Sequence, residues 1–293
     1  MSDGPTPIGL PEPPPLGASA LPAGTYAGST VFITGGGTGL GKAIATEFAR
    51  LGANIVIASR KSDHLEAGEK AITDVGAKVL TVSCDIREPE QIAAAFDAAT
   101  NSFGMPTVLI NNAAANFPVL ADEMSPNAWR TVVDITLNGT FFCAREFARR
   151  HLAAGTSGSI INVGATYAWT GGPGFAHSAA AKAGVKNMVE TLAVEWGPYG
   201  IQVNGLVPGL FPHEDMTADI KGNLKGLDDK GDRQPALRTG RLRELGWAAT
   251  FLASPYARFV SGHTFVVDGA NWQRRSLTNP PVVTVRDQMR PAT

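Results

Sequence analysis

The strongest constraint on the fold is the alternation of short runs rich in β-branched residues with longer stretches of helical periodicity. Seven nearly continuous apolar runs predict strands: Thr30–Thr34, Asn54–Ser59, Lys78–Ser83, Thr107–Asn111, Ser159–Val163, Ile201–Leu206 and Thr264–Val267. Six segments predict helices: 39–51, 63–75, 88–103, 126–152, 177–196 and 241–253. Apolar strands separated by helices are typical of a parallel sheet covered on both faces. The sequence therefore predicts a single α/β domain with a doubly wound sheet of about seven strands.

Three segments depart from this alternation. Residues 1–25 hold seven of the twenty prolines and show no apolar period, which indicates an irregular N-terminal arm. Residues 271–293 form a C-terminal tail without a clear period, so we expect the domain to span residues 26–270. Residues 210–243 are polar and follow a predicted strand end, where ligand crevices of such sheets form. We interpret them as a substrate lid, with a variable surface insertion as the alternative.

Composition excludes several classes of protein. A net charge of −1 gives no support to nucleic-acid binding. Two cysteines, Cys84 and Cys143, and five scattered histidines predict neither a disulfide framework nor a metal site. No apolar run is long enough to span a membrane. Because the first basic residue is Lys42, we expect no signal or transit peptide, and a cytoplasmic location is the default.

A glycine-rich loop joins the first strand to the first helix, and it reads Gly35, Gly36, Gly37, Thr38, Gly39, Leu40 and Gly41. Glycines let the backbone approach a pyrophosphate, and the free N–H groups of the helix start attract the anion. A flexible turn is the alternative. About 20 residues further on, where NAD-binding chains carry an acid, stand Ser59, Arg60 and Lys61. Basic groups there neutralise a 2′-phosphate, so the pattern favours NADPH over NADH.

These residues, with Asn111 and Asn112 after the fourth strand and Lys182 in a later helix, resemble the short-chain dehydrogenase/reductase family over roughly residues 28–270. The resemblance implies a Rossmann-type fold and a homotetramer. It also implies that Asp85 and Ile86 hold the adenine and that Lys182 holds the nicotinamide ribose. The remaining cofactor contacts implied, which border the ribose and the nicotinamide, are Asn112, Ala113, Ala114, Pro208 and Gly209.

The usual catalytic set of that family is asparagine, serine, tyrosine and lysine, and only Lys182 stands at its expected place. Ser178 replaces the tyrosine, Ala165 the serine and Thr136 the asparagine. A lysine about 4 Å from a phenol can contribute about 4 kcal/mol toward ionising it at an effective dielectric of about 20. A serine hydroxyl is far too weakly acidic for the same effect. Ser178 is therefore not expected to be the acid, and simple alcohol–ketone chemistry is disfavoured.

A phenol is nevertheless available in Tyr167, just past the fifth strand, and Asn138 is a polar residue in an apolar helix segment. Taken singly, they could be a bare loop aromatic and a helix asparagine bonded to a carbonyl. Together with Ser178 and Lys182 they resemble the flavin-independent 2,4-dienoyl-CoA reductase branch. That resemblance implies that Tyr167 and Asn138 bind the thioester oxygen of an acyl-CoA, and that the product is a 3-enoyl-CoA.

The charge of the lid agrees with a CoA ligand, because residues 217–243 carry seven basic residues against four Asp. The basic residues are Lys221, Lys225, Lys230, Arg233, Arg238, Arg241 and Arg243. A solvated surface lid would show a similar surplus. Three alternatives stay open for the function: a trans-2-enoyl-CoA reductase, a reductase of another activated alkene or carbonyl, and a non-catalytic NADPH-binding regulator.

Overall fold

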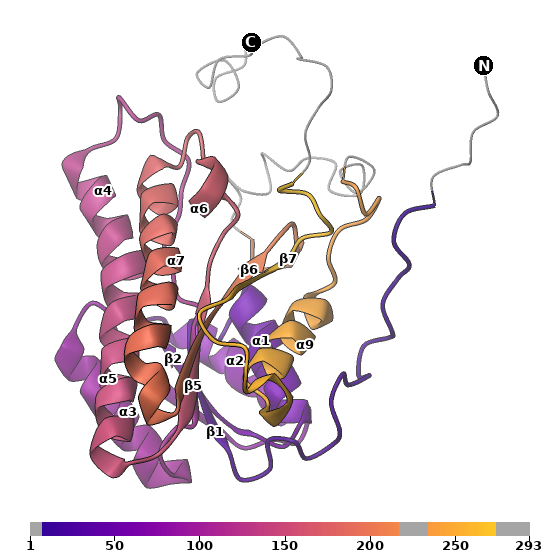
Figure 1. Cartoon of the computed structure of the whole chain (residues 1–293), viewed down its shortest axis with the longest axis vertical. Coiled ribbons are helices and arrows are strands. Elements are labelled where there is room, and N and C mark those ends of the chain that lie inside the picture. Colours follow the sequence, from indigo (N-terminus) through magenta and orange to yellow (C-terminus); the bar gives the residue numbers. More distant parts are fainter. Residues whose placement is uncertain (1–7, 217–233, 274–293) are drawn as a thin grey trace.

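The computed structural model describes residues 8–216 and 234–273. Seven parallel strands form one sheet in the order β3-β2-β1-β4-β5-β6-β7 (Figure 1). The strands are β1 (Thr30–Thr34), β2 (Asn54–Ser59), β3 (Val79–Ser83), β4 (Val108–Asn111), β5 (Gly158–Val163), β6 (Ile201–Pro208) and β7 (Thr264–Val267). The predicted doubly wound sheet is confirmed. The order of the strands reverses between β1 and β4, so a crevice is expected at the carboxyl ends of these two strands.

Helices cover both faces of the sheet (Figure 1). One face carries α1 (Gly39–Arg50), α2 (Ser62–Thr73) and α9 (Leu242–Leu252), and the other carries α3 (Pro89–Phe103), α5 (Gly139–Ala154) and α7 (Ala176–Trp196). Each layer has its own buried core: Phe48 and Leu245 lie in the first, and Phe96 and Phe147 lie in the second. The predicted helices agree with the observed helical residues to within two residues, and the one predicted over 126–152 contains a π turn.

The helix predicted over residues 126–152 runs without a gap from Pro126 to Ala154 and contains a π turn. It consists of α4 (Pro126–Val133), a π-helical turn η1 (Asp134–Asn138) and α5. Gly139, directly after the turn, lies so close to the chain after β3 that a Cβ atom would come within 2.7 Å of the Ile86 side chain. The helix predicted over these residues is confirmed, and the π turn within it was not predicted. π turns of this kind are frequent at functional sites.

Three short turns were also not predicted, because none is long enough to show a period. They are the single helical turn α6 (Tyr167–Thr170) and the 3₁₀ turns η2 (Gly197–Tyr199) and η4 (Pro255–Ala257). The first of them matters for the site, because α6 begins at Tyr167 and packs against α7.

Residues 8–25 form an extended arm that runs beside α9 (Figure 1). The backbone N–H of Leu10 donates to the Ala236 carbonyl at 2.9 Å. Further along, the indole N–H of Trp247 donates to the Ala18 carbonyl at 3.0 Å. The arm therefore contacts residues that lie more than 220 positions later in the chain.

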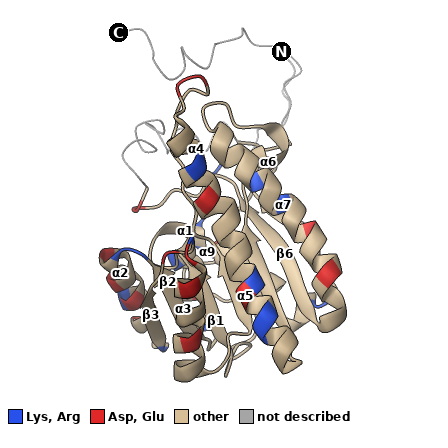
Figure 2. Cartoon of the chain, turned by 90° about the vertical axis from the view of Figure 1, so that its left-hand side faces the viewer, with Lys and Arg blue, Asp and Glu red and all other residues tan. Residues whose placement is uncertain are grey.

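Basic and acidic residues share the outer helices, as Figure 2 shows for α5 and α7. Arg150 lies 2.7 Å from Glu146 on α5, and Lys186 lies 2.5 Å from Glu190 on α7. Among residues 8–216 and 234–273, no helix is both long and apolar enough to cross a membrane. The same residues contain no group of three His, Cys, Asp or Glu side chains that could hold a metal ion.

Candidate active site

The glycine-rich loop is fixed to the end of β4 by side-chain hydrogen bonds. The hydroxyl of Thr34 accepts from the backbone N–H groups of Asn112 and Ala113, at 3.0 and 3.1 Å. In return, the amide of Asn112 donates to the carbonyls of Thr34 and Gly35, at 3.1 and 3.0 Å. Asn112 therefore positions the loop from the neighbouring strand, in addition to bordering the cavity described below.

Two glycines of the loop are required by close approach of backbone. A Cβ atom on Gly37 would overlap the carbonyl of His64, and one on Gly41 would overlap the carbonyl of Gly35. The absence of a side chain at Gly37 lets the start of α2 pack directly against the loop. Thr38, the residue before α1, places no side-chain cap on the helix, and the first turn of α1 carries no acidic residue. The first N–H groups of α1 are thus left to an anion from elsewhere.

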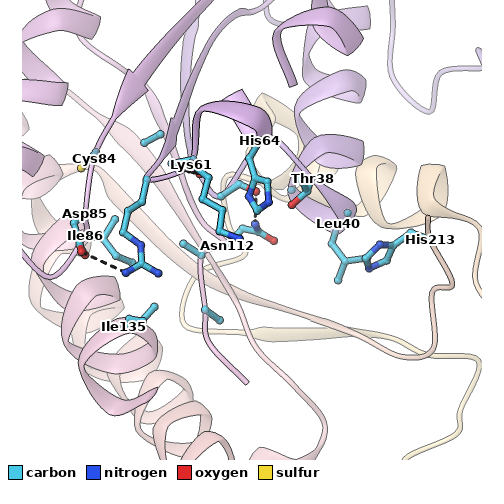
Figure 3. Close-up of a pocket in the computed structure, with 18 residues that line it drawn as sticks. Thr38, Leu40, Lys61, His64, Cys84, Asp85, Ile86, Asn112, Ile135 and His213 are labelled. Atoms are coloured by element: carbon cyan, nitrogen blue, oxygen red, sulfur yellow. Dashed lines mark hydrogen bonds and ion pairs between the residues drawn. The ribbon is translucent and has the colours of Figure 1, made fainter. Parts of the chain in front are cut away.

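A cavity lies at the carboxyl ends of β1, β2 and β4, over this loop (Figure 3). Twelve of the predicted cofactor residues line it: Gly35, Thr38, Gly39, Leu40, Gly41, Arg60, Lys61, Asp85, Ile86, Asn112, Ala113 and Ala114. Four do not: Gly37, Lys182, Pro208 and Gly209. The lining residues that the sequence did not predict are Ala58, Ser59, His64, Cys84, Ile135 and His213. His64 lies in the first turn of α2 and Ile135 lies in the π turn, and neither position has a sequence signal.

Arg60 and Asp85 meet at one end of the cavity (Figure 3, dashed line). The Arg87 guanidinium lies against the Asp85 carboxylate, with Nε donating to Oδ1 at 3.0 Å, and this hydrogen bond is the main cause that lowers the pKa of Asp85 to about 2. Arg60 stands further off, at 3.5 Å, and its side chain is 51% exposed. Arg87 supplies most of the hydrogen bonds that the Asp85 carboxylate accepts. The Arg60 guanidinium therefore keeps N–H donors available for a phosphate.

The second predicted cluster assembles at the end of β5. The Tyr167 hydroxyl, on α6, lies 2.9 Å from the Ser178 hydroxyl on α7. Lys182 follows one helical turn later and donates to the carbonyl of Val163, the last residue of β5. Burial raises the pKa of Tyr167, and the Ser178 hydrogen bond partly offsets this rise. Burial lowers the pKa of Lys182 to about 8. The structure thus brings Tyr167 and Ser178 into contact and places Lys182 on the same helix as Ser178.

Asn138 is the fourth, and the structure does not bring it into contact with the other three. It ends the π turn, and its amide donates to the Asp134 carboxylate at 2.9 Å. Thr136, which stands where the usual asparagine is expected, is fully buried and accepts from the Ala115 N–H at 3.2 Å. Thr136 therefore tethers the chain after β4 to the π turn.

His177 is a buried neighbour of this cluster. Its Nδ1 accepts from the backbone N–H of Ser178 at 2.7 Å, and the Phe117 ring packs edge-on against it with ring centroids 4.8 Å apart. Burial lowers the pKa of His177, so the imidazole is neutral at pH 7. Its contacts fix the first turn of α7, which carries Ser178.

Two tryptophans join the end of the described chain to the active-site turn. Trp169 of α6 stacks on Trp272, with ring centroids 5.2 Å apart and planes 21° apart. Lys186 of α7 lies 5.9 Å from the centroid of Trp169. The stack places the beginning of the C-terminal tail beside α6, two residues from Tyr167. No local sequence pattern predicts this contact.

The basic lid residues that the structure describes face the N-terminal arm. Arg241 pairs with Glu12 at 2.6 Å, and Arg243 donates to the Pro14 carbonyl at 2.6 Å. Arg238 pairs with Glu244 at 2.7 Å. Their role as CoA phosphate ligands stays a prediction. The other four basic residues, Lys221, Lys225, Lys230 and Arg233, lie outside the described residues, as does the centre of the lid.

Comparison with known proteins places this site in a family. Residues 35–270 match the family described as Enoyl-(Acyl carrier protein) reductase. A short chain dehydrogenase from Bacillus anthracis superposes with a TM-score of 0.75 at 40% identity, and the match covers 83% of this chain and 96% of that one. The chain belongs to the short-chain dehydrogenase/reductase family.

Two relatives within the family carry more specific names. A probable 2,4-dienoyl-CoA reductase [(2E)-enoyl-CoA-producing] of Bacillus subtilis is 38% identical, over 83% of this chain and 96% of the relative. The peroxisomal 2,4-dienoyl-CoA reductase [(3E)-enoyl-CoA-producing] of Rattus norvegicus is 41% identical, over 82% of each. These names describe the relatives, and they state two different products.

Membership of the short-chain dehydrogenase/reductase family implies a nicotinamide cofactor, and the cavity fits one. The Asp215 carboxylate accepts a hydrogen bond from the N–H of Gly39 at 2.7 Å, so the start of α1 already holds an anionic oxygen. The glycine contacts leave the loop without side chains at the point where a pyrophosphate approaches. Arg60 and Lys61 line the same cavity. The donor set therefore suits a dinucleotide.

Proposed function

We propose that this chain uses NADPH to reduce a 2,4-dienoyl-CoA. The observation that carries the proposal is the partly buried Tyr167 hydroxyl, which is hydrogen-bonded to Ser178 in place of the tyrosine that the family usually carries on α7. Ser178 lies one helical turn from Lys182. Both relatives named above, at 38% and 41% identity, support the substrate class. The basic pair Arg60 and Lys61 supports NADPH over NADH.

The reaction needs stabilisation of charge on the thioester oxygen. NADPH, when bound, supplies a hydride to the far end of the conjugated chain, and one proton completes the reduction. Tyr167 donates a hydrogen bond to the oxygen that gains the negative charge, from a position where burial strengthens the interaction. Asn138 supplies the second donor in this proposal, because its amide nitrogen carries a hydrogen beyond the one bound to Asp134.

The other residues hold the reactants in place. Lys182 binds the ribose of the cofactor from the end of β5, where its ammonium group donates to the Val163 carbonyl. Ser178 fixes the direction of the Tyr167 hydroxyl through the 2.9 Å contact. Arg60 and Lys61 bind the 2′-phosphate at the opposite end of the cofactor. Each of these side chains is polar or charged, and none of them needs to be the proton donor.

The place of protonation decides the product. A proton delivered to the carbon next to the thioester gives a 3-enoyl-CoA, as the name of the rat relative states, whereas a proton two carbons further along gives a 2-enoyl-CoA, as the name of the Bacillus subtilis relative states. We propose the 3-enoyl product. Identification of the double bond in the isolated product by NMR tests this choice.

A trans-2-enoyl thioester is the second candidate substrate, and the description of the matched family as an enoyl-(acyl carrier protein) reductase favours it. The same oxyanion donors would serve that reaction. A non-catalytic NADPH-binding regulator is the remaining alternative. The presence of Tyr167, Ser178 and Lys182 in the arrangement that the resemblance to the reductase branch implies argues against a regulator.

The test follows NADPH absorbance with three substrates: a 2,4-dienoyl-CoA, a trans-2-enoyl-CoA and a simple ketone. We expect turnover with the first and little with the other two, and a large loss in Tyr167→Phe. Tyr199→Phe is the matched control, since that side chain is 63% exposed and lies away from the site. The proposal fails if the dienoyl thioester is not reduced. Binding of NADPH without turnover of any substrate would favour the regulator.

The homotetramer and the cytoplasmic location also stay proposals. Light scattering on the purified chain tests the first, and fractionation of cells that express it tests the second. The boundaries of the arm, domain and tail, at residues 25 and 270, are best tested by limited proteolysis.

A further inference from the structure

A short acidic segment lies on the start of the cofactor site. After the end of β6 the chain crosses over the glycine-rich loop, and the His213 ring comes to rest against Gly39, where a Cβ atom would lie 2.8 Å from the ring. Asp215 Oδ2 accepts the Gly39 N–H at 2.7 Å and lies 3.1 Å from the ammonium of Lys42. Glu214 also pairs with Lys42, at 3.0 Å.

The Asp215 carboxylate therefore occupies a position that favours anions. Gly39 is the first residue of α1, and the N–H groups of a first helical turn have no partner within their own helix. Burial raises the pKa of Asp215, but the hydrogen bond from Gly39 and the charge of Lys42 outweigh this effect and lower it overall. The group is thus ionised at neutral pH. It caps α1 from a distant part of the chain, 176 residues away.

The cofactor brings a second anion to the same place. In a glycine-rich strand–loop–helix unit, the pyrophosphate of a dinucleotide binds at the helix start. Two anionic groups at one helix start repel each other, and one N–H donates fully to only one acceptor. His213 lines the cofactor cavity beside Leu40, on the far side of Thr38 from Lys61 (Figure 3). The acidic segment consequently borders the region in which the pyrophosphate has to lie.

We propose that Asp215 is an internal competitor of the cofactor pyrophosphate, so that its carboxylate has to leave the Gly39 N–H when NADPH binds. This inference rests on the proposed use of a nicotinamide dinucleotide. It assigns Asp215 a role opposite to that of an ordinary binding residue: the side chain stabilises the empty loop and weakens the cofactor. Lys42 loses one of its two carboxylate partners at the same time and keeps the other, Glu214.

The test compares Asp215→Asn with Glu214→Gln by fluorescence titration of NADPH. The first variant keeps the size of the side chain and removes the competing charge, and we expect its Kd for NADPH to fall about five- to tenfold. Glu214→Gln is the matched control, because Glu214 pairs with the same lysine and its side chain is 80% exposed. We expect its Kd to change less than about twofold.

A second measurement separates competition from simple structural damage. Loss of the carboxylate charge beside Lys42 and the start of α1 should lower the Tm of Asp215→Asn without cofactor, while its affinity for NADPH rises. Damage to the loop would lower both. An unchanged or weaker Kd in Asp215→Asn, with a wild-type chain that binds NADPH, overturns this inference alone. Failure of the wild-type chain to bind either NADPH or NADH overturns the proposed function and this inference with it.

Discussion

The pair formed by Tyr167 and Ser178 gives the sharpest test of the chemistry, because its two hydroxyls are assigned different tasks. Tyr167→Phe removes a donor to the thioester oxygen, and such a loss typically costs about 2.7–4 kcal/mol in the barrier, or about 100- to 900-fold in rate. Ser178→Ala removes only the 2.9 Å hydrogen bond that directs the phenol. A neutral hydrogen bond is worth about 0.5–1.5 kcal/mol, or about two- to 13-fold.

The assay is NADPH absorbance with a 2,4-dienoyl-CoA over a range of substrate concentrations. In Tyr167→Phe we expect kcat and kcat/KM to fall by equal factors, as they do when an interaction exists only in the transition state. Ser178→Ala should retain at least about a tenth of the wild-type rate. Ser178 is 1% exposed, so its replacement could destabilise the fold. The Tm of both variants, measured by thermal unfolding, checks for this effect.

Two outcomes contradict the assignment. If Ser178→Ala loses as much activity as Tyr167→Phe, Ser178 itself contacts the reacting atoms and is more than a positioning residue. If Tyr167→Phe turns over at the wild-type rate, the oxyanion is stabilised by other groups.

The remaining predictions concern Lys182 and Arg60. Burial lowers the pKa of Lys182 to about 8, so its ammonium form is present below that pH and is lost as the pH rises. The Kd for NADPH should therefore increase as the pH rises through about 8 in the wild-type chain, but not in Lys182→Met. Because the unfolded chain keeps this proton up to about pH 10.4, the free energy of unfolding should rise between about pH 8 and pH 10, which thermal melts of the two proteins can check. Arg60→Ala should raise the Kd for NADPH by about 10- to 150-fold, the worth of a charged hydrogen bond, and that for NADH by less than about threefold. Equal losses for both cofactors would mean that Arg60 does not bind the 2′-phosphate.

The sheet was predictable because its signal is local. Apolar β-branched runs such as Thr30–Thr34 and Asn54–Ser59 have the bounds expected from the sequence alone. Ser178 and Lys182 were also predictable as neighbours, since positions four apart share a helix face. Tyr167 joins them because the end of β5 and the start of α7 meet at one edge of the sheet.

The parts that the sequence did not predict depend on contacts between distant segments. The direction of Asn138 follows from the π turn, which accompanies the close packing of Gly139 on Ile86. The basic residue Arg241 was expected to face a phosphate, but Glu12 reaches it from the arm. Neither the contact of Gly139 with Ile86 nor the pairing of Arg241 with Glu12 can be found by examining a window of neighbouring residues, because both form only when the whole chain has folded.

The arm has a consequence for how the molecule is made. Glu12 and Arg241 lie 229 positions apart, so the arm is among the first described segments to be synthesised, and its partners are among the last. At about 5–20 residues per second, roughly 10–50 s pass between the two. The sheet from β1 to β6 can form during that interval, whereas the contacts of the arm with Arg238, Arg241, Arg243 and Trp247 have to wait until these residues have been added. These contacts of the arm therefore form late, only after the start of α9 has been synthesised.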